Sequence, residues 1–338
     1  LTITASLYSS TLLTRFGNVK LTITLTILEF FALIGMAFVT EPTTAILLFV
    51  LHQAVVPLIL FNLDIFMEAL IGTKEESTGG RRGLLLTIMS LTGAIASLGM
   101  GKLLGTGVPN FSSAYLMSAL ILIPFLCIII KHFRGFCDPH YPEAKIFQGI
   151  ASFWKYRDIR NVFFAHFLLQ LFFTWMVLYT PIYLSTVIGF HWENIGIILF
   201  TGLMAYVLLE WLIGYVADNH IGEKEMMAFG FAIMAIATSW FVFLDNSSVI
   251  VWMVAMFMTR VGASFVETTT ESYFFKHTQG KDTNLISIFR ITRPLSYVLG
   301  AVLGSITLYL LPFEVLFVVL GLMMIPGLFF AMALHDTR

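Results

Sequence analysis

The polar stretch Lys131–Arg160, KHFRGFCDPHYPEAKIFQGIASFWKYRDIR, interrupts a chain that is otherwise strongly apolar. Of the 338 residues, 58% are hydrophobic and 12% are charged, and this charged share is about half that of an ordinary soluble domain. The composition therefore indicates a membrane protein. The stretch holds six of the 19 Lys and Arg residues, which marks a cytoplasmic loop if its flanks cross a membrane.

The second half of this stretch has a helical pattern of its own. Its apolar residues recur at helical spacing, with the basic residues elsewhere: Ile146, Phe147, Ile150, Phe153 and Trp154. This pattern predicts an amphipathic helix that lies in the headgroup region of a membrane. The alternative is an ordinary solvated connector.

Apolar runs on both sides of the stretch are long enough to cross about 30 Å of hydrocarbon, which takes roughly 20 helical residues. Residues 1–14 form a shorter apolar run, expected to be part of a further helix. The runs lack the two-residue alternation of barrel strands. We therefore expect an all-α, polytopic membrane protein with ten full spans, at 21–39, 43–68, 83–104, 111–131, 161–188, 194–217, 226–244, 248–271, 285–311 and 313–334.

Basic residues segregate to alternate connections between these spans. Seventeen of the 19 Lys and Arg residues lie in one set of connections or in the adjoining ends of the spans, and this set includes the central stretch and Arg338. The opposite set holds Lys102, and Arg260 falls inside a span. Because loops rich in Lys and Arg stay on the cytoplasmic side, we expect the central loop and the C-terminus to be cytoplasmic.

The two sides of the central stretch repeat one plan. The pair Asp64-x-x-x-Glu68 at the end of one span recurs 203 residues later as Glu267-x-x-x-Glu271. The second half holds six spans, so the repeat predicts that the first half lacks one helix and part of the next. The expected domains are an incomplete N-terminal transmembrane bundle at 1–133, a cytoplasmic linker with the interfacial helix at 134–160, and a C-terminal transmembrane bundle at 161–338.

Two degenerate copies of a loop motif occur at nearly the same offset. The second half reads Gly214-Tyr-Val-Ala-Asp218-Asn-His-Ile-Gly222-Glu-Lys224, and the first reads Ser10-Thr-Leu-Leu-Thr14-Arg15-Phe-Gly17-Asn-Val-Lys20. With the six-plus-six plan and the long central loop, these copies resemble the major facilitator superfamily of secondary transporters, whose motif is G-x-x-x-D-R-x-G-R-K. The first copy departs from that motif, because it has Thr14 where the family has Asp.

The resemblance implies a conformational latch between these loops and the carboxylates at the cytoplasmic ends of the spans at 43–68 and 248–271. Paired charges that are partly desolvated can hold two elements together in one state and release them in another. The alternative is that these charges fix loop orientation or are solvated. The expected latch residues are Arg15, Lys20, Asp64, Glu68, Asp218, Lys224, Glu267 and Glu271.

Arg260 is the thirteenth residue of the 24-residue span 248–271, near the middle of the bilayer. A charge there costs at least about 2.5 kcal/mol and is tolerated mainly where it faces a cavity or a partner. The resemblance implies that this helix lines the central cavity. Arg260 is therefore the first candidate for contact with an anionic or hydrogen-bonding group of a solute. The alternative is a structural pairing with Glu210 or with a backbone carbonyl.

Further cavity candidates lie on two other spans. His166, Gln170 and Thr174 follow one another at four-residue spacing and so share one face of a helix. His52 and Gln53 lie in the span 43–68. The alternative for each His is a satisfied hydrogen bond between helices.

Two acidic residues lie inside spans and are candidates for proton coupling. Glu29 lies near the middle of the span 21–39, and Glu210 lies in the inner third of the span 194–217. Burial disfavours the charged form of a carboxyl group, which makes a buried carboxyl a candidate proton carrier. The alternative for Glu29 is a plain interhelical hydrogen bond.

These patterns predict a secondary active transporter that moves a small solute by alternating access, with proton coupling left open. No nucleotide-binding loop is visible, and Cys137 and His140 alone do not make a metal site. We expect no cofactor, no metal, no catalytic residues and no enzyme activity. The expected partners are the lipid bilayer, an unknown small-molecule solute and, if coupling holds, protons; nucleic acid is not expected, and the chain is expected to be a monomer. The alternative function is a non-transporting membrane sensor or assembly partner on a transporter-like scaffold.

Overall fold

The computed structural model describes residues 12–71, 78–105, 111–138, 156–217, 221–244, 248–278 and 283–335. Within these ranges, ten helices are long and apolar enough to cross a membrane. This confirms the ten predicted spans and the all-α fold class. The predicted interfacial helix and the first 11 residues of the predicted partial helix lie outside the described residues. The helices divide into two compact units, which are described separately.

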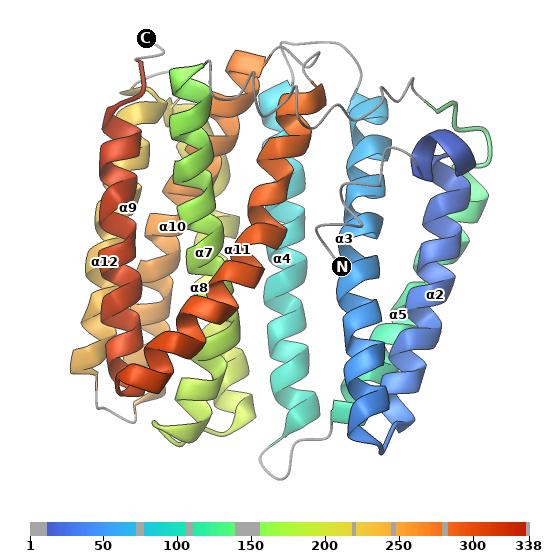
Figure 1. The fold of residues 1–338 in the computed structure, drawn as a ribbon, viewed down its shortest axis with the longest axis horizontal. Helices are drawn as coiled ribbons and strands as arrows, with labels where there is room; N and C mark the ends of the chain where they lie inside the picture. Colours follow the sequence, from blue (N-terminus) through green and yellow to red (C-terminus); the bar gives the residue numbers. More distant parts are fainter. Residues whose placement is uncertain are drawn as a thin grey trace. The chain divides into compact units, whose positions relative to one another are not determined.

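The first unit comprises Leu1–Lys74 and Val108–Lys145. Its three long helices are α2 (Asn18–Phe38), α3 (Pro42–Ile71) and α5 (Phe111–His132). α2 lies against both α3 and α5, as Figure 1 shows. Two small apolar clusters fill these interfaces, one of Leu13, Leu21, Leu25, Val55, Leu58 and Ile59 and one of Leu33, Met36 and Ala119.

A capping interaction fixes the start of α3. Pro42 is the first helical residue, where its missing N–H costs no hydrogen bond. The preceding Glu41 carboxylate accepts a 2.9 Å hydrogen bond from the Thr44 backbone N–H and a second one from the Thr44 hydroxyl. These bonds, with others from Thr43, lower the pKa of the fully exposed Glu41 carboxyl from its ordinary value. The start of the helix is thus defined by local side chains.

The second unit comprises Glu75–Gly107 and Ile146–Arg338. α8 packs against α4 and α10, α9 against α10 and α12, and α7 against α10, α11 and α12. The elements are α4 (Thr78–Leu104), α7 (Arg157–Thr186), α8 (Trp192–Val216), α9 (Glu223–Ser239), the short 3-10 helix η3 (Trp240–Phe243), α10 (Val249–Thr278), α11 (Thr283–Leu310) and α12 (Phe313–Met332).

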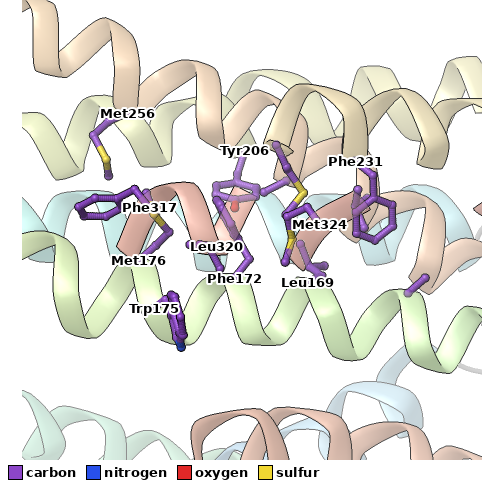
Figure 2. Packing of buried hydrophobic residues seen from close by; sticks show 14 of the residues in the cluster. Leu169, Phe172, Trp175, Met176, Tyr206, Phe231, Met256, Phe317, Leu320 and Met324 are labelled. Carbon is purple, nitrogen blue, oxygen red and sulfur yellow. The ribbon is translucent and has the colours of Figure 1, made fainter. Parts of the chain in front are cut away.

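A large aromatic and methionine-rich core fills this second unit. Figure 2 shows Phe172 and Met176 of α7 beside Leu320 and Phe317 of α12, and all four side chains are buried. Many other large apolar side chains are instead exposed on the outer faces of the helices, including Trp211, Ile236 and Phe329. Exposed apolar surface of this extent is unfavourable in water and matches a lipid surround.

Two glycines bring α4 and α8 into direct backbone contact. A methyl group added at Gly101 would lie 2.9 Å from the Cα of Gly196, and one added at Gly196 would lie 2.8 Å from the Cα of Gly101. Membrane helices associate through such small residues, because lipid provides no hydrophobic drive between them. Gly99, two residues earlier, has nothing within 4 Å of the same added atom.

The compact units do not follow the predicted domain boundaries at one helix. α4 was expected in the N-terminal bundle at 1–133, and it groups instead with the C-terminal helices because it packs against α8. The compact units are defined by contacts between residues, whereas the predicted domains are defined by the sequence repeat, so the two divisions need not coincide. The division at 134–160 therefore stays a prediction from the repeat.

Candidate functional site

The polar stripe predicted on α7 forms a hydrogen-bonded row inside the second unit. His166, Gln170 and Thr174 are all buried. Gln170 Nε2 lies 3.2 Å from His166 Nε2, and His166 Nδ1 lies 3.4 Å from the Thr270 hydroxyl of α10. The Thr174 hydroxyl lies 3.3 Å from the Ser296 hydroxyl of α11. The three residues share one face, as predicted, and that face joins α7 to α10 and α11.

Arg260 is buried at the junction of α7, α8 and α10, with 4% of its surface exposed. Its guanidinium carbon lies 5.4 Å from the ring centre of Phe172 and 5.9 Å from that of Phe173. Its aliphatic stem passes Gly202 of α8, where an added methyl group would lie 3.4 Å from its Cγ. Aromatic faces attract a cation but leave its N–H donors without acceptors.

No ion pair within 4.0 Å involves Arg260 among the residues whose side chains the structure describes. The alternative pairing with Glu210 is therefore not formed. A buried guanidinium without a carboxylate partner is costly. The aromatic rings and the electrostatic interactions with Tyr206 and Glu267 take the place of an ion pair.

Two residues of α8, one turn apart, add polar groups to the same region. Tyr206 is 4% exposed and Glu210 is 2% exposed. The Glu210 Oε2 has no hydrogen-bond partner within the described ranges, whereas the Tyr206 hydroxyl lies close enough to Arg260 to interact with its guanidinium. Arg260 and Glu267 of α10 interact electrostatically with Tyr206, and Glu267 does so with Glu210. We call Tyr206, Glu210, Arg260 and the half-buried Glu267 the buried polar cluster.

The buried polar cluster has the composition of a ligand or proton site. Unpartnered buried polar groups cost free energy, and native proteins usually satisfy such groups. A ligand with an anionic or hydrogen-bonding group would supply acceptors to Arg260, and protonation of a carboxyl would supply a donor. Sequence reasoning identified Arg260 and Glu210 here but missed Tyr206, which lies four residues before Glu210 on the same face.

The predicted latch of the second half is only partly visible. Glu267 and Glu271 are half-buried, and Glu267 interacts electrostatically with Arg260 and Arg293. Lys224 makes no ion pair with a side chain that the structure describes. Asp218 lies outside the described residues. This half of the latch stays a prediction.

A buried ion pair that the sequence did not indicate joins the first turn of α9 to the last turn of α10. Glu223, in the first turn of α9, is fully buried and accepts hydrogen bonds from Lys276 Nζ at 2.5 Å and from the Ser272 hydroxyl at 3.0 Å. The pairing spans 53 residues, so no local pattern could have revealed it.

In the first unit, the predicted latch cations Arg15 and Lys20 are exposed. The side chains of Asp64 and Glu68 are not among those described, so their role stays a prediction. An unexpected carboxylate is present instead: Asp138 Oδ1 accepts a 2.8 Å hydrogen bond from the Asn18 backbone N–H at the start of α2. A carboxylate is favourable at a helix N-terminus.

The structure pairs two candidates of the first unit that the sequence placed in different roles. His52 Nδ1 of α3 lies 2.5 Å from Glu29 Oε1 of α2. The neighbouring predicted cavity residue, Gln53, is exposed. Among the described residues, no group of three or more metal-ligating side chains occurs.

Comparison with known proteins agrees with this architecture. Residues 193–338 match the family model described as "Major Facilitator Superfamily". The fold resembles the crystal structure of the fucose:proton symporter of E. coli, with a TM-score of 0.65 and 16% sequence identity over 97% of this chain and 86% of that one. No curated protein matches the chain. Residues 193–338 are thus similar to the Major Facilitator Superfamily, and the chain as a whole is an integral, multi-pass membrane protein with the fold of that symporter.

Proposed function

We propose that the protein is a secondary active transporter that moves a small solute by alternating access and couples this movement to protons. The family match of residues 193–338 and the shared fold support the general activity. The solute and the coupling go beyond that match and rest on the chain's own buried polar groups. The proposed orientation, with the central loop and the C-terminus in the cytoplasm, rests on the segregation of Lys and Arg.

The observation that carries the proposal is the buried polar cluster around Arg260. A structural arginine would be expected to hold a carboxylate or backbone carbonyl, yet Arg260 forms no ion pair with a described side chain and lies near the rings of Phe172 and Phe173 and the Tyr206 hydroxyl. Its guanidinium has several donors in a fixed plane, which suits a carboxylate, a phosphate or a pair of hydroxyl groups. The solute is therefore expected to present such a group.

A proton role for Glu210 follows from its burial near other carboxyl groups. Glu210 is buried, its Oε2 has no partner among the described residues, and Glu267 and Glu271 interact electrostatically with it. Three neighbouring carboxyl groups cannot all carry charge in a membrane without large repulsion. Proton uptake at this cluster would offset that repulsion when the solute is absent.

Reconstituted vesicles test the proposal through a screen of candidate solutes. The purified chain is placed in vesicles that contain a trapped pH dye, and small carboxylates, phosphates and sugars are added outside one at a time. A coupled solute produces a dye response that depends on the protein. Arg260→Ala is expected to reduce that response at least about tenfold, because contacts to a buried charge contribute about 2–5 kcal/mol.

Arg157→Ala is the matched control, since Arg157 is exposed in the first turn of α7. Arg260→Lys keeps the charge but loses the planar donors, and an intermediate response is expected. Equal responses from the wild type and Arg260→Ala would contradict the role of Arg260. Solute binding without any flux in the wild type would favour the sensor or assembly partner.

A further inference from the structure

Glu29 and His52 form an ionisable pair in the first unit, within the membrane-spanning parts of α2 and α3. The 2.5 Å distance between Glu29 Oε1 and His52 Nδ1 is short for a hydrogen bond. The two side chains are therefore in direct hydrogen-bond contact across the α2–α3 interface.

The two members differ in burial. The Glu29 side chain is 3% exposed and that of His52 is 26% exposed. The second carboxyl oxygen of Glu29, Oε2, has no hydrogen-bond partner within the described ranges. A carboxylate that served only to tie two helices together would be expected to use both oxygens in a medium that offers no water.

We propose that Glu29 and His52 together form one proton-binding site of the first unit, loaded and unloaded through His52. The proposal rests on the proposed function, since it names where a coupled proton is held. The proposal assigns His52 to a proton site rather than to the predicted solute cavity. The exposed side of the His52 ring is expected to face a polar path, because ionisable groups within spans face the bundle interior or water.

The proton balance of the site is simple. In the empty state, Glu29 is a carboxylate that accepts the Nδ1–H of a neutral His52, and the pair carries one negative charge. Uptake of one proton forms one new N–H or O–H bond and makes the pair neutral overall. A net charge is unfavourable within the bilayer, so the loaded, neutral pair is the form suited to conformational change.

The helices α2, α3 and α5 carry other titratable residues besides Glu29 and His52. On α2, the other titratable residue is Lys20 at its start; on α5 they are Tyr115, Cys127, Lys131 and His132; on α3 they are Asp64 and Glu68. Of these, no described side chain has a hydrogen bond or ion pair with Glu29 or His52. Asp64 and Glu68 lie about three and four helical turns beyond His52.

Infrared difference spectroscopy of the full chain in lipid vesicles tests the site directly. The spectrum is recorded as the pH is stepped, without solute and without a gradient. The wild type is expected to show a buried carboxyl band that titrates, and Glu29→Gln is expected to lose that band. His52→Gln is expected to keep the band and to change its proton affinity tenfold or more, about one pH unit.

The matched controls are His191→Gln and Glu193→Gln. His191 directly precedes α8, Glu193 lies in its first turn, and both are exposed. Both are expected to leave the band unchanged. If Glu29→Gln does not fold, Glu29→Asp and His52→Gln carry the test, because both keep the carboxyl group. Thermal unfolding of each variant identifies those that fold.

Three results would overturn the proposal: a wild-type spectrum without the titrating band, a band that persists in Glu29→Gln, or an unchanged midpoint in His52→Gln. The first result would leave a purely structural hydrogen bond. The readout needs no flux, so loss of the Arg260-dependent response and loss of this band are separate outcomes.

Discussion

Individual residues were predictable where their neighbours lie on the same helix. The depth of Arg260 follows from counting along one span, and the shared face of His166, Gln170 and Thr174 follows from four-residue spacing. The Glu29–His52 and Glu223–Lys276 pairs join different helices, and the sequence gives no measure of how two helices are rotated against each other. The sequence shows that each of these residues is an ionisable group, but it does not show which residue of another helix is its partner.

The Glu223–Lys276 pair is expected to stabilise the second unit. Lys276→Met removes the ammonium group that pairs with the fully buried Glu223 carboxylate, whereas the Ser272 hydroxyl remains. Because Lys276 is 43% exposed and partly screened, the free energy of unfolding is expected to fall by about 1–3 kcal/mol. Thermal unfolding in detergent measures the change.

Lys102→Met provides the comparison, since Lys102 is exposed near the end of α4. Lys276→Arg keeps the charge and is expected to retain most of the stability. Equal unfolding midpoints for Lys276→Met and Lys102→Met would show that the buried pair is not stabilising.

At the level of helices, the ten spans were predicted correctly because each exceeds the hydrocarbon thickness in length and apolarity. Their ends were less certain. α7 begins at Arg157 and α10 continues to Thr278, so both helices extend beyond their apolar runs into polar sequence. Hydropathy locates the membrane, whereas hydrogen bonding determines where the helix ends.

The backbone contact between α4 and α8 gives a prediction at this level. Gly101→Val would drive two methyl groups into α8, and overpacking of this kind costs about 1–3 kcal/mol. Gly99→Val places the same side chain on the same helix where nothing lies within 4 Å. Gly101→Val is expected to unfold at a clearly lower temperature than Gly99→Val, and similar unfolding temperatures would contradict close packing at Gly101.

For the whole molecule, the repeat and the charge asymmetry predicted a membrane transporter fold; the comparisons confirm the fold and match residues 193–338 to the family model. The grouping of α4 with α8 was not predictable from the repeat. Internal symmetry states which segments correspond in sequence, whereas compactness depends on side-chain contacts such as those at Gly101 and Gly196.

The predicted orientation can be tested with the two cysteines. Cys137, after α5, and Cys127, within α5, are both free and exposed. A charged, membrane-impermeant maleimide is expected to label Cys137 of Cys127→Ser in inside-out vesicles and not in right-side-out vesicles. Cys137→Ser should remain unlabelled in both, because the bilayer shields Cys127. Labelling of Cys137 from the outer side would reverse the assigned orientation.

The hydrogen bond from the Asn18 N–H to Asp138 has a consequence for biosynthesis. It closes a separation of 120 residues, so the ribosome must synthesise α3, α4 and α5 before the carboxylate exists. Until then, the first turn of α2 lacks this acceptor for one of its four free N–H groups. Completion of the first unit therefore waits for the segment after α5, and a chain released before Asp138 would lack this acceptor for the Asn18 N–H.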